Sequence, residues 1–296
     1  MRTRLQGPDR IEVYFELIEP STPSRANPND ELNIVITLGG VKGCSAARPV
    51  AECFARELNA RVLIWDRRNT HSSGIGYNGI PLVLEDVEDL HALIVHVFGL
   101  IKPCILVGSS SGARVSALLA VKYPNLCAGL MFAPPTGGDA VELLARSYYD
   151  HPSEVIRKHG IDAMLALDDF KDLNERSKNW LRTKAQTEAV VATLETTSRW
   201  MRLFTDSTMI GLDENGLLSL KRFPVCVVHD GNILDQFHTI RTAFKVATAL
   251  SLSAVHLVPG VLKQTPESSK AMCGIIRANL LSKLNTTGTR APPSRL

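Results

Sequence analysis

The chain has 296 residues, enough for one large domain with a sizeable core or for a core with an inserted segment, but few for two independent domains. It is 45% hydrophobic and 21% charged, as soluble globular proteins are, and its formal net charge of +3 comes from 33 basic and 30 acidic residues. Because basic and acidic residues are nearly equal in number, the composition gives no reason to expect a nucleic-acid ligand.

The six cysteines lie far apart and form no C-x-x-C pair, so neither a zinc site nor a redox dithiol is predicted. We expect buried, reduced thiols, no metal and no cofactor. The first ten residues lack the apolar segment of a signal peptide, and no run approaches the roughly 18 apolar residues of a membrane span. The expectation is an intracellular, soluble protein without a membrane span.

Apolar runs alternate with amphipathic segments in the first half of the chain. The predicted strands are 10–18, 32–38, 61–65, 105–108 and 126–132, and the predicted helices are 46–58, 82–100 and 113–123. Alternating strands and helices predict a mostly parallel sheet with right-handed crossovers. In such a sheet the active site lies at the carboxyl ends of the strands.

The pattern changes at residues 139–220, which have helical periodicity without convincing strands. We interpret this segment as a helical cap inserted over the strand ends, the alternative being a helical subdomain that extends the core. Strands then return at 223–229 and 254–258, with helices at 237–250 and 267–284. The predicted division is therefore a core of residues 1–138 and 221–284, a cap of residues 139–220 and a flexible tail of residues 285–296.

A sharp turn is predicted where the strand ending at Gly108 meets the next helix. The sequence Gly108-Ser109-Ser110-Ser111-Gly112 matches G-x-S-x-G, the nucleophile elbow, with Ser110 at its centre. Only glycine fits two residues either side of so tight a turn, which leaves the serine hydroxyl exposed above the sheet. An ordinary Ser/Gly-rich turn is the alternative, but the flanking strand and helix favour the elbow and make Ser110 the candidate nucleophile.

The order of these features resembles the α/β-hydrolase superfamily, in particular capped members such as carbon–carbon bond hydrolases and small-molecule esterases. The resemblance is carried by Leu38-Gly39-Gly40, by Asp66-Arg67-Arg68, by the elbow, by the helical insertion, and by the strand followed by Gly231 and Asp235. It implies an α/β fold with a mostly parallel central sheet flanked by helices. It also implies an oxyanion hole built from the backbone N–H groups of Gly40 and Ser111.

The same resemblance predicts the acid and the base. The acid belongs in the loop after strand 223–229, where Asp235 is our choice and Asp230 the competitor, although either residue can instead cap a helix. The family's catalytic histidine follows the last strand in P-G-x-x-H, but here Lys263 stands in its place. His238 is therefore the predicted base, and a desolvated Lys263 is the alternative. The remaining candidates are His71, His151, His159 and His256.

These residues predict a serine-nucleophile hydrolase for a small or medium apolar ester, thioester or carbon–carbon bond next to a carbonyl. Serine at position 110, rather than aspartate, favours acyl transfer. Because the expected histidine is missing, the alternative is a catalytically degenerate protein of the same fold that binds a small apolar ligand or a partner. The intact elbow favours the hydrolase, and the sequence identifies neither the substrate nor the oligomeric state.

The final tripeptide, Ser294-Arg295-Leu296, resembles the S-K-L signal that a peroxisomal import receptor reads, with arginine keeping the positive charge. The polar, proline-bearing tail before it is suited to hold such a signal away from the folded body. We expect a peroxisomal location if the source is a eukaryote and a cytoplasmic one otherwise.

Overall fold

The computed structural model describes residues 2–4, 11–20, 32–40, 42–100, 102–171, 173 and 175–287. Its centre is an eight-stranded sheet in the order β1-β2-β4-β3-β5-β6-β7-β8. The strands are β1 (Arg2–Arg4), β2 (Glu12–Ile18), β3 (Leu32–Thr37), β4 (Ala60–Trp65), β5 (Cys104–Gly108), β6 (Cys127–Phe132), β7 (Val225–His229) and β8 (Val255–Leu257). Every neighbouring pair from β4 to β8 is parallel, while β1 and β2 are antiparallel at one edge, so the predicted fold class is confirmed.

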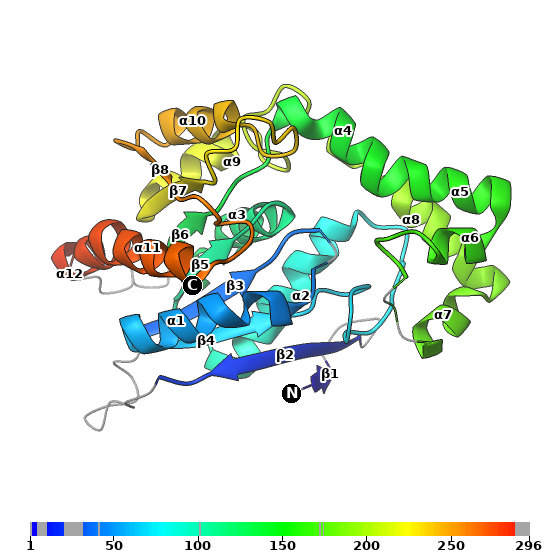
Figure 1. Cartoon of the computed structure of the whole chain (residues 1–296), viewed down its shortest axis with the longest axis horizontal. Coiled ribbons are helices and arrows are strands. Elements are labelled where there is room, and N and C mark those ends of the chain that lie inside the picture. The colour runs from blue at the N-terminus through cyan, green and yellow to red at the C-terminus, as the bar shows by residue number, and fades with distance from the viewer. Residues whose placement is uncertain are drawn as a thin grey trace, which may run out of the picture.

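Helices cover both faces of the sheet (Figure 1). They are α1 (Arg48–Leu58), α2 (Leu82–Phe98), α3 (Ser111–Lys122), α10 (Ile240–Ala249), α11 (Pro266–Ile276) and α12 (Ser282–Thr287). Successive strand residues point to opposite faces, so Val35 packs with α2 and α3 while Ile34 and Ile36 pack with α1 and α11. Burial on both faces explains why the parallel strands are almost continuously apolar in sequence.

Residues 139–220 form α4 (Val141–Ala145), α5 (His151–His159), α6 (Ile161–Leu165), α7 (Glu175–Leu181), α8 (Lys184–Arg202) and α9 (Glu214–Ser219). Helices α4 to α8 extend beyond one end of the sheet (Figure 1). Leu181, Val190 and Leu194 belong to a separate hydrophobic cluster of this segment, whereas Leu212 and Leu217 join the cluster around α2 and α3. Most of the segment therefore has a core of its own, and its last part packs with the sheet.

The carboxyl-terminal helix runs further than the sequence predicted. A wider π-helical turn at Arg277–Leu281 joins α11 to α12, which ends at Thr287 rather than at Leu284. The helix continues past Leu284 because no glycine or proline stands between Leu284 and Gly288. Residues 285–287 are therefore helical and not part of a flexible tail. The tripeptide Ser294-Arg295-Leu296 lies outside the described residues, so the peroxisomal location stays a prediction.

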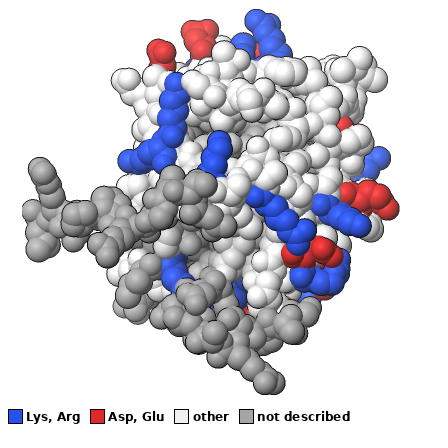
Figure 2. Space-filling model, turned by 90° about the vertical axis from the view of Figure 1, so that its left-hand side faces the viewer, with Lys and Arg blue, Asp and Glu red and all other residues white. Residues whose placement is uncertain are grey.

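The six cysteines are buried and free, as expected. No helix among the described residues is long and apolar enough to cross a membrane. Within the same residues, no three His, Cys, Asp or Glu side chains gather closely enough to hold a metal ion. On the end of the molecule away from α5 to α7, basic side chains stand apart from one another across the part of the surface that the structure describes (Figure 2).

The tightest packing in the sheet region is at the turn between β5 and α3. A Cβ atom on Gly112 would lie 2.0 Å from the backbone oxygen of Thr37, and one on Gly108 would lie 2.5 Å from the Cα of Ala113. A Cβ on Gly39 would lie 2.4 Å from the Cβ of Ser110. The end of β3 and the loop after it can touch the turn after β5 only because Gly39 and Gly112 lack side chains, and the turn itself can close only because Gly108 does.

We predict that Gly112→Ala lowers the free energy of unfolding by about 1–3 kcal/mol, because backbone must move to accommodate the methyl group. Urea unfolding measures the change. Gly274→Ala is the matched control: Gly274 lies in α11, and a Cβ atom there would have no neighbour within 4 Å, so alanine should leave stability unchanged or raise it by about 0.5–1 kcal/mol. Equal stabilities of the two variants would contradict this account of the turn.

Candidate active site

Ser110 has the backbone conformation expected of a nucleophile elbow. It precedes the first residue of α3 with φ 56° and ψ −122°, a combination that residues with side chains rarely adopt. Its N–H donates to the carbonyl of Pro134 after β6 (2.9 Å), and the N–H of Ser109 donates to Thr37 of β3 (3.0 Å). Strain of this kind persists only where the surroundings hold it, and here both neighbouring strands do so.

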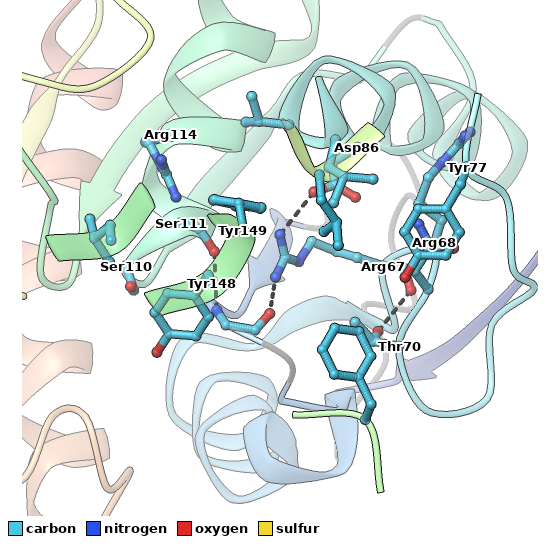
Figure 3. Close-up of a pocket in the computed structure, with 17 residues that line it drawn as sticks. Arg67, Arg68, Thr70, Tyr77, Asp86, Ser110, Ser111, Arg114, Tyr148 and Tyr149 are labelled. Atoms are coloured by element: carbon cyan, nitrogen blue, oxygen red, sulfur yellow. Dashed lines mark hydrogen bonds and ion pairs between the residues drawn. The ribbon is translucent and has the colours of Figure 1, made fainter. Parts of the chain in front are cut away.

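Ser110 borders a cavity of about 100 Å³ between the strand ends and the helical segment (Figure 3). Liquid water occupies about 30 Å³ per molecule, so the cavity suits a small group. One wall is apolar and consists of Leu82, Val83, Leu144, Phe170 and Leu194. The rest is polar and contains Arg67, Arg68, Asp86, Arg114, Tyr77, Tyr148 and Tyr149. The segment 139–220 contributes to the cavity, because it supplies the lining residues Leu144, Tyr148, Tyr149, Phe170 and Leu194.

The two predicted oxyanion-hole residues lie together beside the cavity. The N–H of Gly40 donates to the Oγ of Ser111 at 3.1 Å. Arg67 holds this loop in place, since its guanidinium donates to the carbonyl of Gly40 and pairs with Asp86 Oδ2 at 2.8 Å. The sequence did not predict that the Gly40 N–H donates to the Ser111 hydroxyl. The feature that could have suggested it is a hydroxyl residue directly after Ser110.

Asp235 and His238 form a hydrogen-bonded pair in the loop before α10. His238 Nδ1 lies 2.8 Å from Asp235 Oδ2, while Asp235 Oδ1 accepts from the N–H groups of Phe237 (2.9 Å) and His238 (3.0 Å). Burial opposes the charge of Asp235, but these hydrogen bonds outweigh it and lower its pKa. Asp235 does not cap α10, whose N-terminus is capped by Thr239.

Burial also lowers the pKa of His238 below its ordinary value of 6.5, although Asp235 acts in the opposite direction. The ring is therefore neutral at pH 7, and the bond to Asp235 assigns its proton to Nδ1. This leaves Nε2 as a proton acceptor, and Nε2 is buried without a hydrogen-bond partner. A neutral imidazole held by a carboxylate and free at Nε2 is the form that a general base requires.

The structure does not join this pair to Ser110 by a hydrogen bond. Neither Asp235 nor His238 lines the cavity that Ser110 borders. Hydrogen bonds between catalytic groups are often long in ligand-free enzymes and shorten when substrate binds. The predicted nucleophile and the predicted acid–base pair are therefore each formed, but they are not in contact.

Two further residues fix the position of the His238 loop. The buried His229, which ends β7, has its Nε2 2.7 Å from the carbonyl of His238, and its Nδ1 accepts from Gly231 N–H at 2.9 Å. Asp230, the competing acid, instead accepts from Gly260 N–H at 3.2 Å and links the loops after β7 and β8. Sequence reasoning missed His229 because the pattern places it as the last residue of a buried strand.

The other candidate bases lie elsewhere. Lys263 is exposed and does not line the cavity that Ser110 borders. His256 lies on β8 and lines a separate cavity with Asn279 and Lys283. The remaining three, all exposed, are His71, His151 and His159.

A family model described as "Alpha/beta hydrolase family" matches residues 41–251, which is more than half of the chain. Solved structures with the same fold include three whose similarity spans nearly the whole chain. A thermophilic esterase from Thermogutta terrifontis is 20% identical, with a TM-score of 0.62, and the match covers 96% of this chain and 98% of that one.

A putative lipase from Acinetobacter baumannii AYE is 14% identical, with a TM-score of 0.62 and coverage of 97% of this chain and 92% of that one. The enol-lactonase from Burkholderia xenovorans LB400 is also 14% identical, with a TM-score of 0.60 and coverage of 95% and 100%. At these identities the likeness concerns the fold.

We predict that the imidazole of His238 titrates below pH 6.5 and that Asp235→Asn lowers its pKa further, because the carboxylate stabilises the protonated ring. An NMR titration of the histidine resonances measures both values, and His238→Gln assigns the resonance by its disappearance. A pKa that Asp235→Asn leaves unchanged would show that the pair does not form in solution, and a pKa above 6.5 would show that burial does not govern the titration of His238.

Proposed function

The chain belongs to the alpha/beta hydrolase family, and from this premise we propose that it is a serine hydrolase that cleaves a small carboxylic ester or lactone. The observation that carries the proposal is Ser110, held in a strained elbow conformation at the border of a cavity. An esterase, a putative lipase and an enol-lactonase among the similar structures support this class of reaction. Thioesters and carbon–carbon bonds next to a carbonyl are related substrates that the same chemistry accepts.

In the proposed reaction, His238 Nε2 accepts the proton of Ser110 as its Oγ attacks the substrate carbonyl. Asp235 stabilises the imidazolium and keeps Nδ1 protonated, and His238 then returns the proton to the departing alcohol. A water molecule activated by His238 hydrolyses the resulting acyl-enzyme. The lowered pKa of His238 suits this role, since the ring is in its basic form at neutral pH.

The negative charge on the carbonyl oxygen is assigned to the N–H groups of Ser111 and Gly40. A donor of this kind commonly contributes about 3 kcal/mol to transition-state stabilisation. Because the Gly40 N–H donates to Ser111 Oγ, the oxyanion must displace this hydroxyl before Gly40 can serve. The displaced hydroxyl can itself donate to the oxyanion, since serine is both donor and acceptor.

The proposal requires His238 to approach Ser110 when substrate binds. The loop that carries the acid–base pair has features that suit such a movement: Ile233 and Leu234 are 80% and 82% exposed and contribute little packing. Hydrogen bonds to His229 hold the loop at Gly231 and at the carbonyl of His238, so the approach to Ser110 is assigned to the His238 side chain.

A protein that binds a small ligand without turnover is the second candidate. The observation that favours it is the missing hydrogen bond between Ser110 and His238, together with the buried, unpartnered Nε2. The two candidates differ in whether Ser110 reacts with an electrophile, because an unactivated serine hydroxyl is a weak nucleophile.

We predict that a fluorophosphonate probe labels the wild-type protein and that Ser110→Ala abolishes labelling. His238→Ala should lower kcat for 4-nitrophenyl acetate by about 100-fold or more, because the general base is lost. Lys263→Met and His256→Gln are the matched controls and should retain activity, since Lys263 is exposed and His256 lines a separate cavity.

Two results would count against the hydrolase. Equal labelling of wild type and Ser110→Ala would show that another residue reacts. A folded wild-type protein that neither reacts with the probe nor hydrolyses the ester would favour the binding protein.

A further inference from the structure

The cavity beside Ser110 contains three arginines, and only two of them have acidic partners (Figure 3). Arg67 pairs with Asp86 at 2.8 Å. Arg68 pairs with Glu85 at 2.6 Å and with Asp89 at 2.7 Å. Arg114 is only 3% exposed, forms no ion pair with any residue that the structure describes, and has a buried Nε without a hydrogen-bond partner.

This arrangement is unfavourable for the protein alone. Burial lowers the pKa of Arg114, and the positive charge of Arg67 adds to this effect, while the hydroxyl of Tyr149 and the carboxylate of Asp86 oppose it. Arginine nevertheless stays protonated in proteins. A buried guanidinium that shares Asp86 with Arg67 and leaves its own Nε without a hydrogen-bond partner destabilises the fold, so packing does not explain why an arginine occupies this position.

The position of Arg114 relates it to the reacting serine. It follows Ser110 by four residues, in the first turn of α3, and both residues line the same cavity. In Figure 3 Arg114 extends from α3 toward Tyr149, on the same side of the cavity as Ser110. A molecule that reacts at Ser110 can therefore reach the guanidinium with a group a few bonds from its carbonyl.

We propose that Arg114 binds a carboxylate in the acyl part of the substrate, so that the preferred substrates are monoesters of short dicarboxylic acids. The guanidinium offers the paired donors that a carboxylate accepts, and the anion supplies the acceptor and the close ion pair that Arg114 lacks among the described residues. The acyl part is the one that fits, because the cavity holds only about 100 Å³ and the alcohol must leave to solvent. Its apolar wall accommodates the short methylene chain between the two carbonyl carbons.

The reaction of the ester at Ser110 rests on the proposed function. The binding of the anion at Arg114 does not depend on it. Kinetics therefore supply one test: ethanol release from monoethyl succinate and monoethyl glutarate is compared with release from ethyl levulinate, a neutral ester of similar shape. We expect kcat/KM to favour one of the charged esters by about 10- to 100-fold, the range of a charge-assisted hydrogen bond. Arg114→Met should reduce this ratio to near 1, and Arg114→Lys should keep part of it.

Arg241→Met is the matched control for the loss of a positive charge, because Arg241 is 75% exposed on α10, and it should leave the ratio as in wild type. The melting temperature of the variant distinguishes a role of Arg114 in binding from a role in stabilising the fold. Arg114→Met should leave it unchanged or raise it, since an unpaired buried charge is removed. A wild type without preference for the charged esters, or a preference that Arg114→Met retains, overturns the proposal.

Calorimetric titration of the Ser110→Ala protein with succinate, glutarate and inorganic phosphate supplies the second test and needs no turnover. We expect at least one dicarboxylate to bind, and Arg114→Met to weaken its binding about 10-fold or more. If no ester is hydrolysed but this result is obtained, the proposed function fails and the anion site stands. Binding that Arg114→Met leaves unchanged, no binding of either dicarboxylate, or tighter binding of phosphate overturns the carboxylate assignment.

Discussion

The close approach of the β3 loop to the turn after β5 is the constraint on which the site depends. A Cβ atom on Gly39 would lie 2.4 Å from Ser110 and one on Gly112 would lie 2.0 Å from Thr37, so this contact exists only because both positions lack side chains, while Gly108 lets β5 pack closely against the start of α3. It fixes Ser110 in its strained conformation and places the N–H of Gly40 beside Ser111. The candidate nucleophile and both candidate oxyanion donors therefore follow from a single packing contact.

Charge divides the site into two regions. At the cavity, Arg67 is matched by Asp86 and Arg68 by Glu85 and Asp89, whereas Arg114 has no counter-ion among the described residues. In the loop before α10, burial keeps His238 neutral although Asp235 acts in the opposite direction, and the bond from Nδ1 to Asp235 leaves Nε2 ready to accept a proton. One region suits the binding of an anion, and the other suits the movement of a proton.

Apolar periodicity was enough to predict the sheet, and glycine spacing within five residues was enough to predict the elbow. Asp235 was named as the acid through the resemblance and His238 as the base because the expected histidine is missing, and only the structure shows that the two are hydrogen-bonded. The resemblance placed Gly40 and Ser111 together, but the hydrogen bond from Gly40 N–H to Ser111 Oγ, across 71 positions, was not indicated. The sequence also did not predict that Arg114 has no ion pair among the described residues, because this depends on the fold, in which Asp86 pairs with Arg67, and Glu85 and Asp89 pair with Arg68. The same limit applies to the separation of His238 from Ser110.

The central claim is that Ser110, His238, Gly40 and Ser111 act on one carbonyl. A crystal structure of the protein after reaction with a small phosphonate ester tests it most directly, since the adduct imitates the tetrahedral intermediate. The account predicts phosphorus bonded to Ser110 Oγ, a phosphonyl oxygen within about 3 Å of the N–H groups of Gly40 and Ser111, and His238 Nε2 within hydrogen-bond reach of the adduct. A phosphonate on another residue, or an adduct at Ser110 with His238 still turned away, would contradict it.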